Sequence, residues 1–211
     1  MELFTDPRAP SPRRVHLFLR VRAIELPLRR VDLAGGEHLS DAYRDLNPAG
    51  TVPALVLDDG TVLTEVMAIC RYLDERADGP PLYGNTPLER ARILDREHWV
   101  EMQGLLAVMD GFRNASPGLR DRALPGPAPV VQLPELAERG RQRFERFLDE
   151  LDLRLTASPG LAGEQLTPAD IAAFVVLEFA RWGTGQAPGH AHKAIRSWQA
   201  RMIDWLEPAD A

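Results

Sequence analysis

Cysteine is almost absent from this sequence, and so are an excess of basic residues and long apolar runs. Cys70 is the single cysteine among 211 residues, which excludes an intrachain disulfide. The 25 basic residues are outnumbered by 31 acidic ones, so the net charge of −6 offers no basic surface for nucleic acid or an anionic membrane. No apolar run is long enough to span a bilayer, and the first residues lack the apolar core of a secretion signal. We therefore expect a cytoplasmic protein with no nucleic-acid partner and no membrane partner.

Hydrophobic residues make up 45% of the chain, which is enough for a substantial core. A stretch rich in proline and glycine around residue 80 ends a helical pattern, and Thr86-Pro87-Leu88-Glu89 then shows the pattern of a capped helix start. We predict an N-terminal domain at residues 1–79, a linker at 80–86 and an all-helical domain at 87–211.

The N-terminal part predicts the order β-α-β-α-β-β-α. A short strand at Glu2-Leu3-Phe4 precedes a proline-dense turn and an apolar helix, for which Ser11 suits the N-cap and Pro12 the first helical position. A second strand is expected from Leu26 to Leu33, followed by a short helix that ends near Leu46. This order is that of a thioredoxin-like sheet with a parallel crossover between its first two strands and an antiparallel hairpin at its end.

The stretch from Asn47 to Glu65 carries the clearest local signals. Pro53 lies where a strand begins, and an X-Pro bond can be cis there. The backbone of Val52 would then be open to pair with an extended peptide-like ligand, while Glu65 lies at a helix start and could receive an ammonium or amide group. The alternative is a plain β-hairpin with a helix behind it.

The sequences NPAGTVPAL, LDDGTVLTE and AICRYLDE, in that order, resemble the glutathione-binding half of a cytosolic glutathione transferase. The resemblance implies that Pro53 is the family's proline before the third strand, that Val52 pairs with the ligand backbone and that Glu65 binds the γ-glutamyl group. Most members carry serine or threonine after that acid, whereas this chain has Val66, which leaves only a backbone N–H for the γ-glutamyl carboxylate. The fold implied is a thioredoxin-like α/β domain followed by an all-α domain.

Ser11 has two interpretations. As an N-cap it would contribute about 1 kcal/mol to the first helix. As a ligand-binding residue its hydroxyl would donate to a thiolate at the helix N-terminus, where the macrodipole favours negative charge. The cysteine of the bacterial beta-type transferases aligns with Ser11, whereas the serine of theta-like transferases falls near Ala9 or Pro10, so Ser11 is the candidate thiol activator.

His38 follows Gly35-Gly36-Glu37 in a sequence that resembles theta-like and related fungal and bacterial transferases, in which this histidine reaches the glycine carboxylate of glutathione. The alternative is a surface histidine. Cys70 lies in an amphipathic pattern and is interpreted as a core thiol and not as a nucleophile.

The second half predicts a long helix from Leu88 to about Ala115, a proline-rich loop, a second long helix and a buried helix that begins at Thr167-Pro168-Ala169-Asp170. In the subgroup that this chain resembles, the segment after Phe112 lies over the glutathione site. Arg113, Asn114 and Ser116 are therefore candidates for the thiol or electrophile side, or else they only end a helix.

The resemblance implies a homodimeric glutathione transferase that uses glutathione as co-substrate, needs no metal and conjugates the thiolate to a small, hydrophobic electrophile. Two alternatives remain open. One is a glutathione-dependent peroxidase or disulfide reductase, although the first helix has no cysteine. The other is a non-catalytic binding or regulatory module on the same fold.

Overall fold

The computed structural model describes residues 1–206, which form two compact units. The first unit contains Met1–Gly79 together with a distant loop, Leu124–Val130. The second contains Pro80–Ala123 and the described residues that follow Val130.

The first unit is built on a four-stranded mixed sheet with the strand order β2-β1-β3-β4. Strand β1 (Glu2–Thr5) pairs in parallel with β2 (Leu28–Arg30) and antiparallel with β3 (Ala54–Val56), which in turn pairs antiparallel with β4 (Val62–Leu63). The predicted thioredoxin-like order of strands and helices is thereby confirmed. Strand β2 is shorter than the predicted Leu26 to Leu33, because it lies at the sheet edge, where all three of its residues are exposed.

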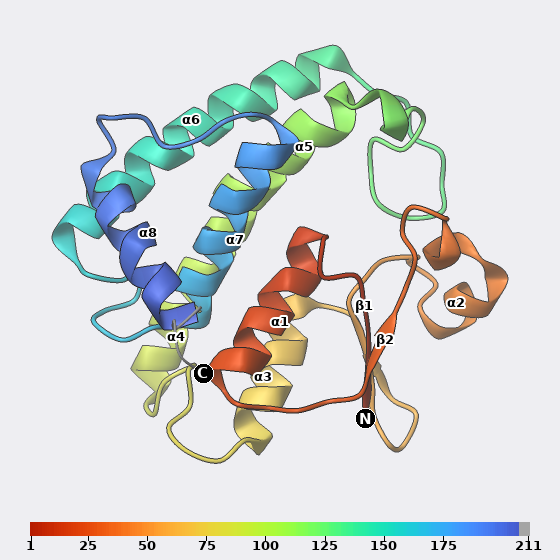
Figure 1. Cartoon of the computed structure of the whole chain (residues 1–211), viewed down its shortest axis with the longest axis horizontal. Helices are drawn as coiled ribbons and strands as arrows, with labels where there is room; N and C mark the ends of the chain where they lie inside the picture. The colour runs from red at the N-terminus through yellow and green to blue at the C-terminus, as the bar shows by residue number, and fades with distance from the viewer. Residues whose placement is uncertain (207–211) are drawn as a thin grey trace. The chain divides into compact units, whose positions relative to one another are not determined.

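Helices cover both faces of this sheet. Figure 1 shows α1 (Pro10–Val21) and α3 (Val66–Arg76) on one side of the strands and α2 (Asp41–Leu46) on the other. A short 3₁₀ helix, η1 (Glu37–Leu39), precedes α2. The core between the sheet, α1 and α3 consists of side chains that are at most 2% exposed: Leu3, Val15, Phe18, Leu55, Ile69 and Leu73.

A buried ion pair joins the ends of α1 and α3. The Nε atom of Arg22 lies 2.8 Å from Oδ1 of Asp74, and both side chains are at most 7% exposed. The same guanidinium donates to the backbone carbonyl of Asp78 (3.1 Å), just beyond α3. These contacts hold together α1, which follows β1 in the sequence, and α3, which follows β4.

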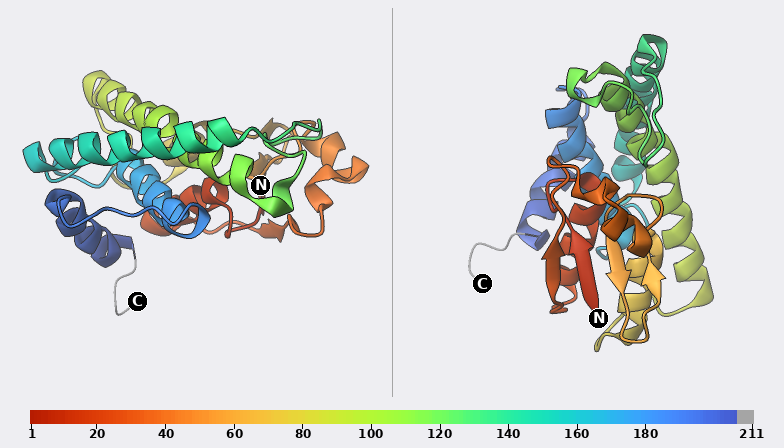
Figure 2. Two further views of the ribbon diagram at one scale, coloured as in Figure 1. Left: turned by 90° about the horizontal axis from the view of Figure 1, so that it is seen from above. Right: turned by 90° about the vertical axis from the view of Figure 1, so that its right-hand side faces the viewer.

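The second unit is all helical, as the sequence predicts. A continuous segment runs through α4 (Pro87–Trp99), a π-helical turn (Val100–Leu105) and α5 (Leu106–Ala115), and a 3₁₀ turn, η3 (Pro117–Leu119), follows. Helix α6 (Pro134–Ala157) lies alongside α5 in every view of Figures 1 and 2. The unit is completed by α7 (Pro168–Gly183) and α8 (Lys193–Leu206), and no helix within residues 1–206 is long and apolar enough to cross a membrane.

Two helices of this unit begin with the predicted capping boxes. In α4, Thr86 accepts from the backbone N–H of Glu89, whose carboxylate accepts from the N–H of Thr86. In α7, the carboxylate of Asp170 accepts from the N–H (3.0 Å) and hydroxyl (2.6 Å) of Thr167, and also from the N–H of Leu161 (2.9 Å). Asp170 is fully buried, whereas Glu89 is exposed, so the same motif has different energetic weight in the two helices.

This difference predicts the effects of removing each carboxylate. Asp170→Ala should lower the free energy of unfolding by about 3 kcal/mol, because it leaves buried donors without an acceptor. Glu89→Ala is the matched control and should cost much less, since water can replace the exposed carboxylate. Urea unfolding of both variants measures the difference, and equal losses would show that burial does not set the strength of the box.

Candidate functional site

The loop from Asn47 to Pro53 brings the chain into β3. The bond between Val52 and Pro53 is cis, which the sequence had indicated, and the first paired residue of β3 is Ala54. The Val52 peptide therefore lies just outside the sheet ladder. Asn47 folds the loop, because its backbone carbonyl accepts from Gly50 (2.9 Å) and its side-chain oxygen accepts from Ala49 (3.2 Å).

Glycine is required at position 50 for two reasons. Its φ of +58° is in the left-handed region, and a Cβ atom there would lie 3.1 Å from the carbonyl oxygen of His38 and 3.2 Å from the side chain of Leu39. Pro127, from the distant loop Leu124–Val130, also lies near this position, 3.9 Å from where the Cβ would be. The loop that carries Val52 thus lies close to η1 and to a segment more than seventy residues away in the sequence.

Glu65 and Val66 mark the N-terminus of α3. Glu65 is the N-cap residue, its carbonyl accepts from Ile69 (2.9 Å), and its side chain makes no capping bond to its own helix. The Glu65 side chain is exposed. Val66 is buried, so only its backbone N–H remains available at this helix end.

His38 lies in η1 and is only 7% exposed, which contradicts the alternative of a surface histidine. Glu37 holds the preceding turn, because its carboxylate accepts from the N–H of Asp32 (2.7 Å). Asp32 accepts in turn from the N–H of Ala34 (3.1 Å). The imidazole is therefore carried by an ordered turn and not by an open loop.

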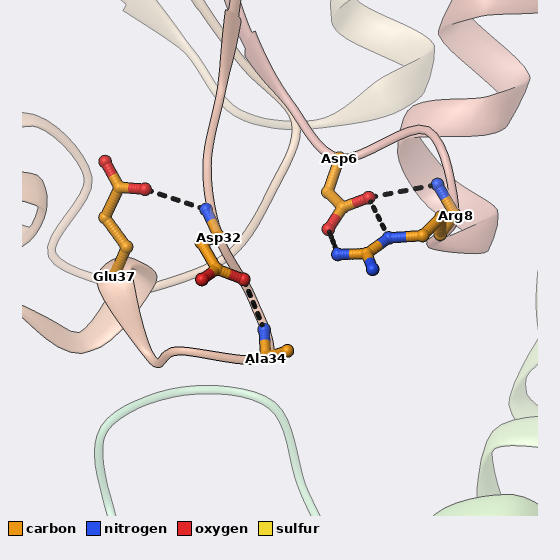
Figure 3. Close-up of polar contacts among 5 residues, drawn as sticks. All are labelled: Asp6, Arg8, Asp32, Ala34 and Glu37. Carbon is orange, nitrogen blue, oxygen red and sulfur yellow. Dashed lines mark hydrogen bonds and ion pairs between the residues drawn. The ribbon is translucent and has the colours of Figure 1, made fainter.

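A charged latch shapes the loop between β1 and α1 (Figure 3). Asp6 is 1% exposed, and its carboxylate accepts from Nε (2.9 Å), Nη2 (2.5 Å) and the backbone N–H (3.2 Å) of Arg8. The hydrogen bond from the Arg8 side chain is the main reason why the pKa of Asp6 is lowered from its ordinary value. The latch ends one residue before Ala9, the N-cap of α1.

Helix α1 begins two residues earlier than predicted, which is a correction to the role of Ser11. The N-cap is Ala9, which makes no side-chain cap bond, and Pro10 occupies the first helical position. Ser11 is therefore the second helical residue and not a cap. The prediction failed because the first-turn N–H groups have no partner within the helix, so a proline fits at position 10 as well as at 12.

Three polar residues predicted for the thiol or electrophile side lie at the end of α5 in the second unit. Asn114 uses its side chain internally, since its amide donates to the carbonyl of Asp110 (3.0 Å) and its oxygen accepts from the N–H of Leu133 (2.9 Å). Arg113 donates to the carbonyl of Arg122 (2.7 Å), and burial lowers its pKa. Gln132 binds the carbonyls of Arg113 (2.6 Å) and Ser116 (2.8 Å). These contacts shape the loop, and a ligand contact of this segment stays a prediction.

The sequence interpretation missed the residues that support the site. Asp6, Arg8, Tyr43 and Asn47 bind backbone groups or each other within the first unit, and the only early signals were the Asp-Pro and Asn-Pro turns. Cys70 is 3% exposed in α3, which agrees with its interpretation as a core thiol. Within residues 1–206 no three histidine, cysteine or acidic side chains come together as a metal site would require.

The fold and this loop define a protein class, in which a thioredoxin-like unit with a cis-proline loop is joined to a helical unit. Sequence comparison agrees: residues 9–76 match the N-terminal domain model of glutathione S-transferases, and residues 134–210 match the C-terminal domain model. The chain belongs to the glutathione S-transferase family and is a glutathione transferase enzyme.

Comparison with individual transferases indicates the subgroup of the family to which the chain is similar. The chain is 33% identical to glutathione S-transferase 2 of Saccharomyces cerevisiae, over 96% of this chain and 85% of that protein. It is 34% identical to human glutathione S-transferase theta-2, over 82% of this chain and 68% of that protein. The crystal structure of a Gtt2-class transferase from Vibrio parahaemolyticus superimposes with a TM-score of 0.83 at 31% identity, covering 99% and 96% of the two chains. The predicted theta-like, fungal-type subgroup is thereby confirmed.

The Asp6–Arg8 latch predicts a dependence of stability on pH. Because the pKa of Asp6 is lowered in the folded state, its ionised form stabilises the fold above the ordinary pKa, and this contribution is lost as pH falls through the folded value. Asp6→Asn should therefore unfold more easily than wild type at pH 7, and the difference should shrink as the pH falls below 3.8, the ordinary pKa of this carboxyl group. Urea unfolding across this range checks the expectation, and a difference that does not change with pH would contradict it.

Proposed function

We propose that glutathione binds to the first unit in an extended conformation, with its peptide backbone paired to Val52 beside Pro53. The γ-glutamyl group then contacts Glu65 and the N–H of Val66, and His38 receives the glycine carboxylate. The observation that carries this proposal is the Val52 peptide, which lies next to the sheet but outside its ladder. The exposed Glu65 carboxylate, which caps nothing in its own helix, supports the γ-glutamyl assignment.

Ser11 is the proposed thiol activator. Its hydroxyl has no hydrogen-bond partner within residues 1–206, and it lies in the first turn of α1, where free N–H groups and the helix dipole favour an anion. A thiol with a pKa of about 8.5 is only a few per cent ionised at neutral pH, and lowering that pKa by two units requires about 2.7 kcal/mol. One charge-assisted hydrogen bond together with the dipole is of that size.

The second substrate is proposed to be a small hydrophobic electrophile that is attacked by the thiolate. An aromatic cluster in the helical unit supports this choice: Phe112 lies 5.4 Å from Phe179 and 5.3 Å from Trp182 between ring centroids, and Trp182 is 57% exposed. Arg113, Asn114 and Ser116 adjoin Phe112 in the sequence and stay candidates for the thiol or electrophile side. The protein is further proposed to be a cytoplasmic homodimer that needs no metal.

The γ-glutamyl assignment can be tested within a single helix. Glu65→Ala should raise the Kd for glutathione about tenfold or more, because it removes a charged partner of the ligand. Cys70→Ala is the control, since it removes only a small packing group from the same helix. Calorimetry measures both affinities, and sedimentation of the same samples checks the dimer. No wild-type binding at millimolar glutathione, or equal effects of the two variants, would show that the site is misplaced.

The thiol activator is tested by titration of the bound thiolate. Ser11→Ala should raise the pKa of bound glutathione by about one to two units and slow conjugation at neutral pH by about tenfold, with recovery at high pH. Stability should change little, because Ser11 is not a cap. Ser197→Ala, at an exposed position of α8, is the control and should alter neither quantity. An unmoved thiol titration would assign activation to the helix dipole or to the segment from Arg113 to Ser116.

A further inference from the structure

Two buried side chains converge on one backbone oxygen immediately before Val52. The hydroxyl of Tyr43 donates to the carbonyl of Thr51 at 2.6 Å, and the side-chain amide of Asn47 donates to the same oxygen at 2.8 Å. The Asn47 amide also lies 3.2 Å from the hydroxyl of Thr51. We call this arrangement of Tyr43 and Asn47 the Thr51 clamp.

Both members of the clamp are buried and fixed by helix α2. Tyr43 is 5% exposed and Asn47 is 2% exposed. They are four residues apart, and the N–H of Asn47 donates to the carbonyl of Tyr43 (2.8 Å), so the end of α2 sets the position of both side chains. The Tyr43 ring packs near Phe4 of β1, with ring centroids 6.3 Å apart. The clamp is therefore anchored to both the helix and the sheet.

Tyr43 and Asn47 both remain hydrogen-bond donors over the physiological pH range. Burial raises the pKa of Tyr43 to about 12, so the phenol keeps its proton at any physiological pH. The Asn47 amide does not titrate. The two hydrogen bonds to Thr51 therefore persist across the pH range in which a thiol would be activated.

The geometry of one peptide bond connects this clamp to the ligand. The Thr51 carbonyl and the Val52 N–H belong to the same planar peptide unit, and in a trans peptide they point in opposite directions. Fixing the oxygen therefore fixes the direction of the N–H. Two donors on the carbonyl also polarise the amide, which strengthens its N–H as a donor.

We propose that Tyr43 and Asn47 are positioning residues for glutathione, which aim the Val52 N–H at the ligand backbone through the Thr51 carbonyl. This inference rests on the proposed pairing of glutathione with Val52. Neither residue needs to touch the ligand. A purely structural role would instead hold the loop for stability and leave ligand affinity unchanged.

Tyr43→Phe isolates the effect, because it removes one hydroxyl and keeps the packed ring. We expect the Kd for glutathione to rise about three- to tenfold, since Asn47 still binds the carbonyl. With an activated aryl halide as second substrate, KM for glutathione should rise by the same factor, while kcat at saturating glutathione stays within about twofold. Tyr72→Phe is the matched control: Tyr72 lies in α3 of the same unit, its ring faces Arg76, and its loss of a hydroxyl should leave affinity unchanged.

A second variant, Asn47→Asp, tests whether loss of the other donor to Thr51 has the same effect as loss of the Tyr43 hydroxyl. The substitution retains an acceptor for the N–H of Ala49 but loses the donor to Thr51. It should weaken glutathione binding in the same direction as Tyr43→Phe. If both variants fold and bind glutathione with unchanged affinity, the proposed positioning role of the Thr51 clamp is wrong.

The amide signal of Val52 in ¹⁵N-labelled protein separates the clamp from the site on which it rests. A large shift of this signal on glutathione saturation in wild type, with weaker saturation in Tyr43→Phe but not in Tyr72→Phe, supports the inference. A large shift with equal affinity in wild type and Tyr43→Phe overturns the clamp alone. Saturable binding without any shift of Val52 overturns the proposed pairing and the clamp with it.

Discussion

The loop from Asn47 to Pro53 depends on the contacts made by the carbonyl oxygen of Thr51. It accepts from a phenol and an amide that are both buried, so the loop could not move away without leaving two donors unpaired in the protein interior. The free-energy cost of two unpaired buried donors favours a single conformation of the loop. Fixed backbone donors lose little entropy when a peptide ligand binds, which is the general advantage of a preorganised site.

Parts of the chain that are far apart in sequence hold the same loop. Gly50 leaves room for the carbonyl of His38, and Pro127 of the loop Leu124–Val130 also lies nearby. The buried pair of Arg22 and Asp74 ties α1 to α3, whose N-termini carry Ser11 and Glu65. Of the candidate site residues Glu65 is exposed, whereas His38 and the clamp residues Tyr43 and Asn47 are buried.

The two halves of the site differed in how well they could be predicted. The Asn47 to Glu65 stretch was predicted well, because Asn-Pro, Val-Pro and Asp-Gly each restrict the backbone locally and leave few alternatives. The loop before α1 was predicted less well, because Pro10 and Pro12 both suit a first helical turn. In the structure the helix begins at Pro10, and the Asp6–Arg8 latch with its buried carboxylate lies directly before it.

The sequence by itself determined the order of strands and helices, the capping boxes of α4 and α7, the position of the cis proline and the family. These features depend on local backbone preferences and on short sequence motifs, which do not require tertiary contacts. The tertiary structure decided that His38 is buried, that Glu65 is exposed, that Asn114 binds the backbone of Leu133 and that Tyr43 and Asn47 meet at Thr51. Burial and convergence on one atom are properties of packing between elements, and no local pattern specifies which side chains will share an acceptor.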